Sequence, residues 1–134
     1  MLSIIIHQDY DTLIDNNIYP SIAIKVIEHE FSEIGNCKEK QNTSLDMCSI
    51  SEYSEDKDSE NILVKIGGAP SLIQDEESYY KELEEHGFSF FLSIDEDGYS
   101  EDVTVGSYPF GYGALYLYKH HTTNEIIAGF WQCS

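Results

Sequence analysis

Residues 64–74 read Val64-Lys65-Ile66-Gly67-Gly68-Ala69-Pro70-Ser71-Leu72-Ile73-Gln74. Before the glycines, Ile62, Val64 and Ile66 place β-branched side chains on one face of a strand. The two glycines permit backbone dihedrals that a Cβ disfavours, and Pro70 fixes its own φ without needing an amide donor. This segment therefore predicts the end of a strand, a tight turn and the approach to a helix.

A helix is predicted over residues 75–86. Asp75 has a side chain suited to the N-cap, and the acidic residues after it lie in the first turn, where the helix dipole favours anions. Glu77 and Lys81 are four positions apart and suit an ion pair across one turn. Gly87 is the expected left-handed stop. An apolar stripe for the core is formed by Tyr79, Tyr80 and Leu83.

The other regular segments are predicted to be strands, from alternating patterns or short apolar runs. They cover residues 2–6, 21–31, 45–50, 61–66, 88–95, 114–118 and 126–133. One face of the 88–95 strand is expected to carry Phe88, Phe90, Leu92 and Ile94. Residues 114–118 are apolar on both faces, which indicates a central strand. The sequence predicts one α+β domain over residues 1–134, mostly antiparallel sheet with one clear helix and one or two helical turns over 9–17.

The charge of the chain limits its partners. It has 25 acidic and seven basic residues, a formal charge of -18, and every basic residue is a lysine. Binding to phosphates requires clustered Lys and Arg, and Arg is the usual reader of guanine edges. Nucleic acids and anionic membrane surfaces are therefore not expected partners, whereas a basic protein is. Acidity that serves only solubility is the alternative explanation.

The cysteines and the N-terminus indicate a cytoplasmic chain. Cys37, Cys48 and Cys133 are an odd number without a Cys-x-x-Cys pair, so neither a disulfide framework nor a zinc knuckle is predicted. The first residues lack a basic region and have only a brief apolar run, unlike a signal peptide, and no stretch approaches the length of a membrane span.

Three segments together resemble the YwqG-like family. They are Lys65-Ile66-Gly67-Gly68-Ala69-Pro70, Phe91-Leu92-Ser93-Ile94-Asp95 and Gly111-Tyr112-Gly113-Ala114-Leu115-Tyr116-Leu117-Tyr118. Members of that family have a strand ending in Gly-Gly-x-Pro, a later Phe-Leu-x-Gln-Ile-Asp strand and a glycine-rich passage into a Leu-Tyr-Leu-Phe strand. The resemblance covers roughly the C-terminal half of the chain.

This chain departs from the family pattern in three ways. Ser93 stands where Gln is usual, Lys65 stands where Arg is frequent, and the chain has about half the length of full members. The distant relation to programmed cell death protein 2 brings no Cys-x-x-Cys metal pairs, and the family has no agreed catalytic residues to carry over. The resemblance implies an α+β, mostly antiparallel fold. It also implies a frequent bacterial setting beside toxin genes, where small acidic proteins act as immunity proteins.

An acidic run after the 88–95 strand resembles a calcium loop only in composition. The carboxylates that suggest such a loop are Asp95, Asp97, Glu101 and Asp102. An EF-hand loop requires Gly at its sixth position and Glu at its twelfth, where this chain has Ser100 and Gly106. A turn with solvated carboxylates is the better interpretation.

No catalytic or metal site is predicted elsewhere. His120 and His121 are adjacent, so on a strand they would point to opposite faces, and a polar hairpin end is expected instead. Cys133 is expected to be a small buried thiol. The glycines at 67–68 are not followed by Gly-Lys-Ser/Thr and do not form a phosphate loop. Carboxylates are so abundant that no single pair indicates hydrolysis.

The function expected from charge and resemblance is that of a bacterial immunity protein, of the kind found in contact-dependent inhibition. It would neutralise a cognate basic toxin domain, for example a nuclease, by placing carboxylates against its active site. No cofactor is expected. A small-molecule or regulatory-protein binding module is the main alternative, and a carboxylate hydrolase is a third. The partner-binding residues are expected to be Glu55, Asp56, Asp58, Asp75, Glu76, Asp95, Asp97, Glu101, Asp102, Tyr108, Phe110 and Tyr112.

Overall fold

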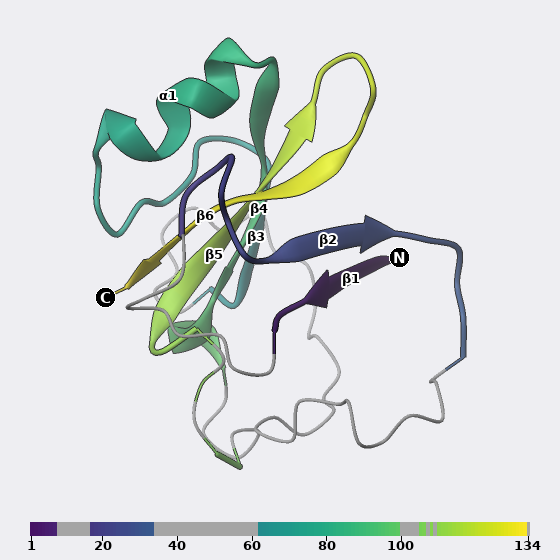
Figure 1. The fold of residues 1–134 in the computed structure, drawn as a ribbon. Coiled ribbons are helices and arrows are strands. Elements are labelled where there is room, and N and C mark those ends of the chain that lie inside the picture. Colours follow the sequence, from purple (N-terminus) through teal and green to yellow (C-terminus); the bar gives the residue numbers. More distant parts are fainter. Residues whose placement is uncertain (8–16, 34–61, 100–104, 107, 109, 134) are drawn as a thin grey trace.

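The computed structural model describes residues 1–7, 17–33, 62–99, 105–106, 108 and 110–133. These residues form an α+β fold with two antiparallel sheets, as the sequence predicts (Figure 1). The smaller sheet pairs β1 (Leu2–Ile5) with β2 (Lys25–Glu28). The larger has the order β3 (Val64–Ile66), β4 (Phe88–Asp95), β5 (Gly113–His120) and β6 (Ile126–Cys133). The helix α1 spans Glu77–Glu85, and a 3₁₀ turn, η2, spans Glu96–Gly98.

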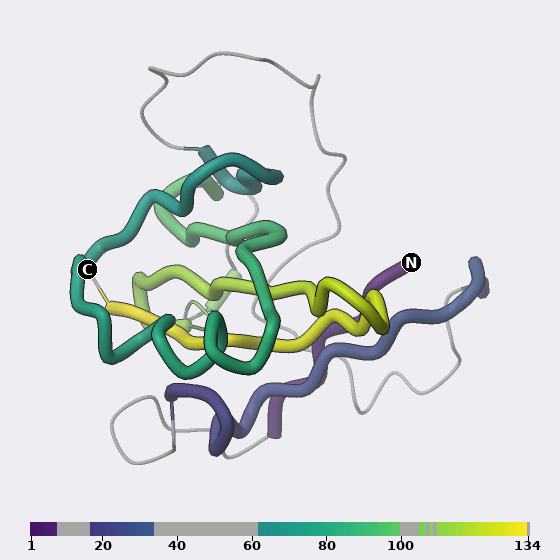
Figure 2. The backbone as a smooth tube through the Cα atoms, turned by 90° about the horizontal axis from the view of Figure 1, so that it is seen from above, coloured from purple at the N-terminus to yellow at the C-terminus, as the bar shows by residue number. Residues whose placement is uncertain are grey.

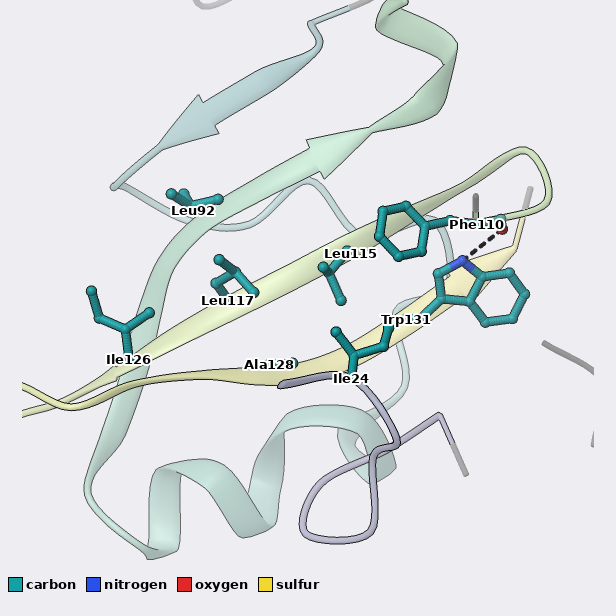
Figure 3. Packing of buried hydrophobic residues seen from close by; sticks show 8 residues of the cluster. All are labelled: Ile24, Leu92, Phe110, Leu115, Leu117, Ile126, Ala128 and Trp131. Carbon is teal, nitrogen blue, oxygen red and sulfur yellow. Dashed lines mark hydrogen bonds between the residues drawn. The ribbon is translucent and has the colours of Figure 1, made fainter. Parts of the chain in front are cut away.

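The four-stranded sheet is covered on both faces. On one face, Ile24, which immediately precedes β2, belongs to a cluster with Leu115, Leu117 and Trp131 (Figure 3), and side chains of the β1–β2 pair pack against this cluster. On the other face, Leu83 of α1 is fully buried in a second cluster. The central strand β5 supplies side chains to both clusters, which confirms the position predicted from its apolar pattern.

A bulge in β4 changes which side chains share a face. The pairing of β4 with β5 shifts between Phe90 and Leu92, so Phe91 is inserted between two paired positions. Phe88 and Phe90 consequently pack on the α1 side, whereas Leu92 and Ile94 pack on the β1–β2 side. The prediction that all four share one face was wrong, because simple alternation does not survive an inserted residue.

A second bulge lies in β6. Pairing with β5 shifts between Tyr116 and Leu117, which pair with Phe130 and Ala128. The inserted residue is Gly129, where an added Cβ would lie 2.6 Å from a ring carbon of Tyr118. Only a glycine therefore allows this strand to lie so close to the tyrosine.

The segment between β3 and α1, residues 67–76, crosses the α1 face of the sheet (Figure 2). Gly67 and Gly68 both have φ near +68°, the conformation that the diglycine pattern anticipates. The Tyr116 hydroxyl donates to the Ser71 carbonyl at 2.7 Å. The buried Gln132 side chain accepts from the amides of Ile73 and Gln74 and donates back to the Gln74 carbonyl at 2.7 Å. We call residues 67–76 the crossing segment.

The helix is shorter at its start than predicted. Its N-cap is Glu76 rather than Asp75, and the Glu76 side chain makes no capping bond. The bonds from Gln132 fix residues 73 and 74 on the sheet, and Glu76 is still extended, so the helix begins only after it. The predicted stop is confirmed, since Gly87 has φ +82°. The predicted ion pair between Lys81 and Glu77 has an N–O distance of 3.6 Å.

The N-terminal segments agree in pattern but not in length. Ile22, Ile24 and Val26 alternate toward the core as predicted, yet β2 covers only four residues of the expected 21–31. β2 pairs only with the four residues of β1, so its ladder ends where β1 ends. The predicted helical turns over 9–17 and the strand over 45–50 lie outside the described residues, except for position 17.

The outer edge of β6 has a backbone partner. Ile18 forms an isolated antiparallel bridge with Phe130. The Tyr19 amide donates to the Gly129 carbonyl at 2.7 Å, and the Trp131 amide donates to the Asn17 carbonyl at 2.9 Å. Residues 17–19 thus continue the hydrogen-bonding pattern beyond the last strand.

Candidate functional site

The predicted partner-binding residues that the structure describes fall into two places. Asp75 and Glu76 lie at the start of α1, whereas Asp95, Asp97, Tyr108 and Tyr112 lie in or near the connection from β4 to β5. Five further residues are outside the described part of the chain: Glu55, Asp56, Asp58, Glu101 and Asp102.

The β4–β5 connection gathers aromatic rings beside an acidic turn. Tyr108 stacks on Tyr99 at a centroid distance of 6.1 Å and meets Tyr112 edge-on at 4.6 Å. Tyr112 is 60% exposed, and Asp97 in the turn is exposed as well. Phe110 differs, because it is only 4% exposed and belongs to the core. Its ring is used for packing and is not available to a partner.

Glu96 in the same acidic turn is fully buried, although the sequence predicts solvated carboxylates there. Its two oxygens accept the amides of Phe110 at 2.6 Å and Tyr112 at 2.9 Å. Burial raises the pKa of this carboxyl, and the backbone amides, including that of Gly113, oppose that rise. Glu96 therefore stabilises the β4–β5 connection through internal hydrogen bonds to its backbone. The glycine-rich run 111–113, whose amides need acceptors, was the available sequence signal.

A groove of about 740 Å³ lies between the crossing segment, α1 and the start of β4. Its walls include Pro70 and Leu72 of the crossing segment and Tyr80 of α1. The groove is lined by Gly68, Ala69, Pro70, Leu72, Asp75, Tyr80, Glu84, Phe88, Ser89, Phe90, Tyr118 and His121. Most of these side chains are apolar or aromatic, and two are carboxylates. We call this feature the α1 groove.

Tyr118 lines the α1 groove from β5 and is only 3% exposed. Its ring contacts Phe90 and Phe130, but its hydroxyl has no hydrogen-bond partner among the described residues. Burial raises the pKa of Tyr118, and the charge of Glu84 and the hydroxyl of Tyr80 raise it further. Both of those residues line the α1 groove, as Tyr118 itself does.

Tyr116, two positions earlier on the same face, shows the usual arrangement for a buried tyrosine. Burial raises its pKa to about 12, and its hydroxyl donates to the Ser71 carbonyl. Buried hydroxyls are normally paired in this way. The sequence could not distinguish the two tyrosines, because only the path of the crossing segment decides which of them receives a backbone partner.

The α1 groove lies beside the most acidic element described. From Asp75 to Glu85 the chain carries six carboxylates and one lysine, Lys81, which pairs with Glu77. Asp75 and Glu84 belong to the groove wall itself. Desolvation raises the pKa of Tyr80, and the charges of Asp75, Glu77 and Glu84 contribute in the same direction. The α1 groove therefore combines a negative electrostatic field with a partly apolar wall.

Cys133 was predicted to be buried and is exposed instead, a prediction that was wrong because the residue ends β6 at the margin of the sheet. His120 is part of the hairpin end, as expected, and its Nδ1 accepts the amides of Thr122 and Thr123. Within the described residues, no three His, Cys, Asp or Glu side chains gather in a way that could hold a metal ion. In the same part of the chain, no helix is both long and apolar enough to cross a bilayer.

Comparison with known proteins gives no relative from which a role could be transferred. No protein-family model matches the chain, and neither does any curated protein or solved structure. The likeness to the YwqG-like family therefore stays a prediction from the three segments quoted above.

Proposed function

We propose that this chain is a non-enzymatic protein-binding domain of the immunity type, which acts in the bacterial cytoplasm on a cognate basic toxin domain. The observation that supports it best is the placement of six carboxylates, from Asp75 to Glu85, beside an aromatic groove. A charged field accelerates the encounter with a partner of opposite sign, and an apolar anchor slows its release.

The proposed mechanism is occlusion. Carboxylates of α1 would take the place of substrate phosphates against the lysines and arginines of a toxin, which suits a nuclease best. Close charge pairs in such interfaces can couple by about 1.5–7 kcal/mol. The exposed Asp97 and Tyr112 at the β4–β5 connection offer a second acidic and aromatic contact region.

The test compares two triple variants with equal net charge. One removes α1 carboxylates outside the groove, with Glu76→Gln, Glu82→Gln and Glu85→Gln. Its matched control removes exposed carboxylates in and after β2, with Glu28→Gln, Glu30→Gln and Glu33→Gln. Each is co-expressed with the product of the neighbouring gene, which the proposal expects to be the toxin, growth rescue is scored, and the association rate of the purified proteins is measured.

We expect the α1 triple variant to associate about tenfold more slowly at low salt and to rescue growth poorly, while the control behaves like the parent protein. The parent's association should also slow as salt is added, because added ions screen exposed charges. Equal behaviour of the two triple variants, or salt-independent association, would contradict the proposal.

A small-molecule binding module is the second candidate, and the size of the α1 groove favours it. Pockets for small ligands commonly have volumes of about 300–1,000 Å³ and mostly apolar walls with a few polar groups. Native mass spectrometry of the purified protein tests this candidate. A stoichiometric bound compound would support it, and bare protein together with toxin rescue would support the immunity role instead.

A further inference from the structure

We infer that the α1 groove is a receptor for one arginine side chain of a protein partner. The guanidinium would lie between the carboxylates of Asp75 and Glu84 and donate to the Tyr118 hydroxyl, with its stem along the aromatic wall. This inference rests on the proposed function, because it names the contact at which a basic partner would be anchored.

The charge of the groove selects a cation. Of its lining residues, Asp75 and Glu84 are acidic, none is a lysine, and His121 is the one histidine. Lys81, the nearest lysine in sequence, pairs with Glu77. A positive group that enters the groove thus meets two carboxylates without a competing ammonium from the wall.

The buried Tyr118 in the groove wall is an independent sign that the groove binds a polar group. A hydroxyl removed from water without a partner lowers stability, so proteins rarely keep one. Tyr118 lies in the groove wall at 3% exposure, and its phenol is protonated at physiological pH, since burial raises a pKa whose ordinary value is already 10.0. A neutral phenol can accept from a guanidinium and can donate its own proton to a carboxylate such as Glu84.

The shape of the wall favours arginine over lysine. A guanidinium is planar, carries five donors and stacks on aromatic faces, whereas an ammonium is a compact, strongly hydrated charge. Three rings, of Tyr80, Phe88 and Phe90, are available beside Tyr118. A volume of about 740 Å³ exceeds one side chain, so an apolar residue next to the arginine can lie along Leu72.

The experiment uses the full chain and a short peptide probe. Acetyl-Leu-Arg-amide is titrated and followed by NMR, together with the citrulline counterpart, which has the same shape but no charge. The protein variants are Tyr118→Phe, Asp75→Asn and Glu84→Gln. The control is Glu82→Gln, an exposed carboxylate of the same helix that does not line the groove.

We expect the arginine peptide to shift the groove resonances and the citrulline peptide to bind at least about tenfold more weakly. Tyr118→Phe should weaken arginine binding by about tenfold without lowering the melting temperature, because the hydroxyl has no partner to lose among the residues that the structure describes. Asp75→Asn and Glu84→Gln should weaken it similarly, and Glu82→Gln should not.

Equal binding of the two peptides would overturn the inference, and so would a Tyr118→Phe variant that binds as well as the parent. If Tyr118→Phe lowers the melting temperature, the hydroxyl stabilises the folded protein and is not a ligand-binding group. If the α1 triple variant weakens toxin association and growth rescue but Tyr118→Phe does not, the inference fails and the proposed function stands. If neither variant weakens them, both fail.

Discussion

Glu96 and Tyr118 are both buried, but the hydrogen bonding of their side-chain oxygen atoms differs. The carboxylate of Glu96 is buried completely and receives the amides of Phe110 and Tyr112. The hydroxyl of Tyr118 is almost as buried and receives nothing among the described residues. A satisfied buried group holds neighbouring structure in place, whereas an unsatisfied one lowers stability until a ligand pairs with it.

Glu96 should make stability depend on pH. Burial raises its pKa above the ordinary value of 4.5, so the folded state binds the proton more tightly than the unfolded state. The contribution of Glu96 to the free energy of unfolding is therefore largest at low pH and falls as pH rises from about 4.5 through the raised pKa. Glu96→Gln removes this dependence.

Urea denaturation of the parent and of Glu96→Gln between about pH 4 and pH 7 measures the effect. The difference in unfolding free energy, parent minus variant, should decrease with rising pH by about 1.4 kcal/mol for each unit of raised pKa. If the unfolding free energies of the parent and the variant change with pH by the same amount, Glu96 keeps its ordinary pKa in the folded protein.

The two tyrosines of β5 provide a matched pair for stability. Tyr116→Phe removes the donor to the Ser71 carbonyl and should lower the unfolding free energy by about 1–2 kcal/mol. Tyr118→Phe removes a hydroxyl with no described partner and should leave stability unchanged or raise it. Thermal and urea denaturation of both variants decide this, and equal losses would show that the Tyr118 hydroxyl is paired.

At the level of elements, the sequence predicted what depends on neighbouring residues. The stop at Gly87, the pair of Glu77 with Lys81 and the central position of residues 114–118 follow from local pattern, and the structure confirms them. The bulge at Phe91 and the late start of α1 depend on residues far away in sequence, so spacing alone could not reveal them.

The candidate site was only partly predictable for the same reason. Asp75 was identified by its charge. Tyr118 and Glu84 line the same groove only because the crossing segment and α1 pack on the sheet. Phe110 was predicted to be a partner-binding residue, and an aromatic residue in a glycine-rich loop gives no indication of which way its side chain points. The structure turns it inward.

The crossing segment should loosen when Gln132 is changed. Gln132→Leu removes the acceptor for the Ile73 and Gln74 amides and the donor to the Gln74 carbonyl. We expect a loss of about 1–3 kcal/mol in unfolding free energy and faster hydrogen exchange at residues 73 and 74. The amides in the middle of β5 provide the internal control, since their exchange should change only as much as global stability does. Unchanged exchange at 73 and 74 would contradict this role of Gln132.

For the whole molecule, the large excess of acidic over basic residues predicts net self-repulsion. The chain has a formal charge of -18, and a net charge far from zero disfavours the compact state. Salt shortens the reach of this repulsion, with a Debye length of roughly 30 Å at about 0.01 M and roughly 8 Å at about 0.15 M.

Adding sodium chloride over that range should therefore raise the unfolding free energy, by on the order of 1 kcal/mol. Urea denaturation at each salt concentration measures the rise, and potassium chloride at equal ionic strength should give the same result. Stability that stays constant or falls with salt would mean that attractive pairs outweigh the repulsion.

The short bridge from residues 17–19 to the margin of β6 has a consequence for the behaviour of the protein in concentrated solution. An outermost strand with open amides and carbonyls is a template on which other chains can add as in a fibril. Ile18 and its two neighbours occupy that template around Phe130 and Trp131. If residues 17–19 detach, the edge of β6 becomes exposed and other chains can pair with it. Repulsion between the negatively charged copies would then oppose aggregation.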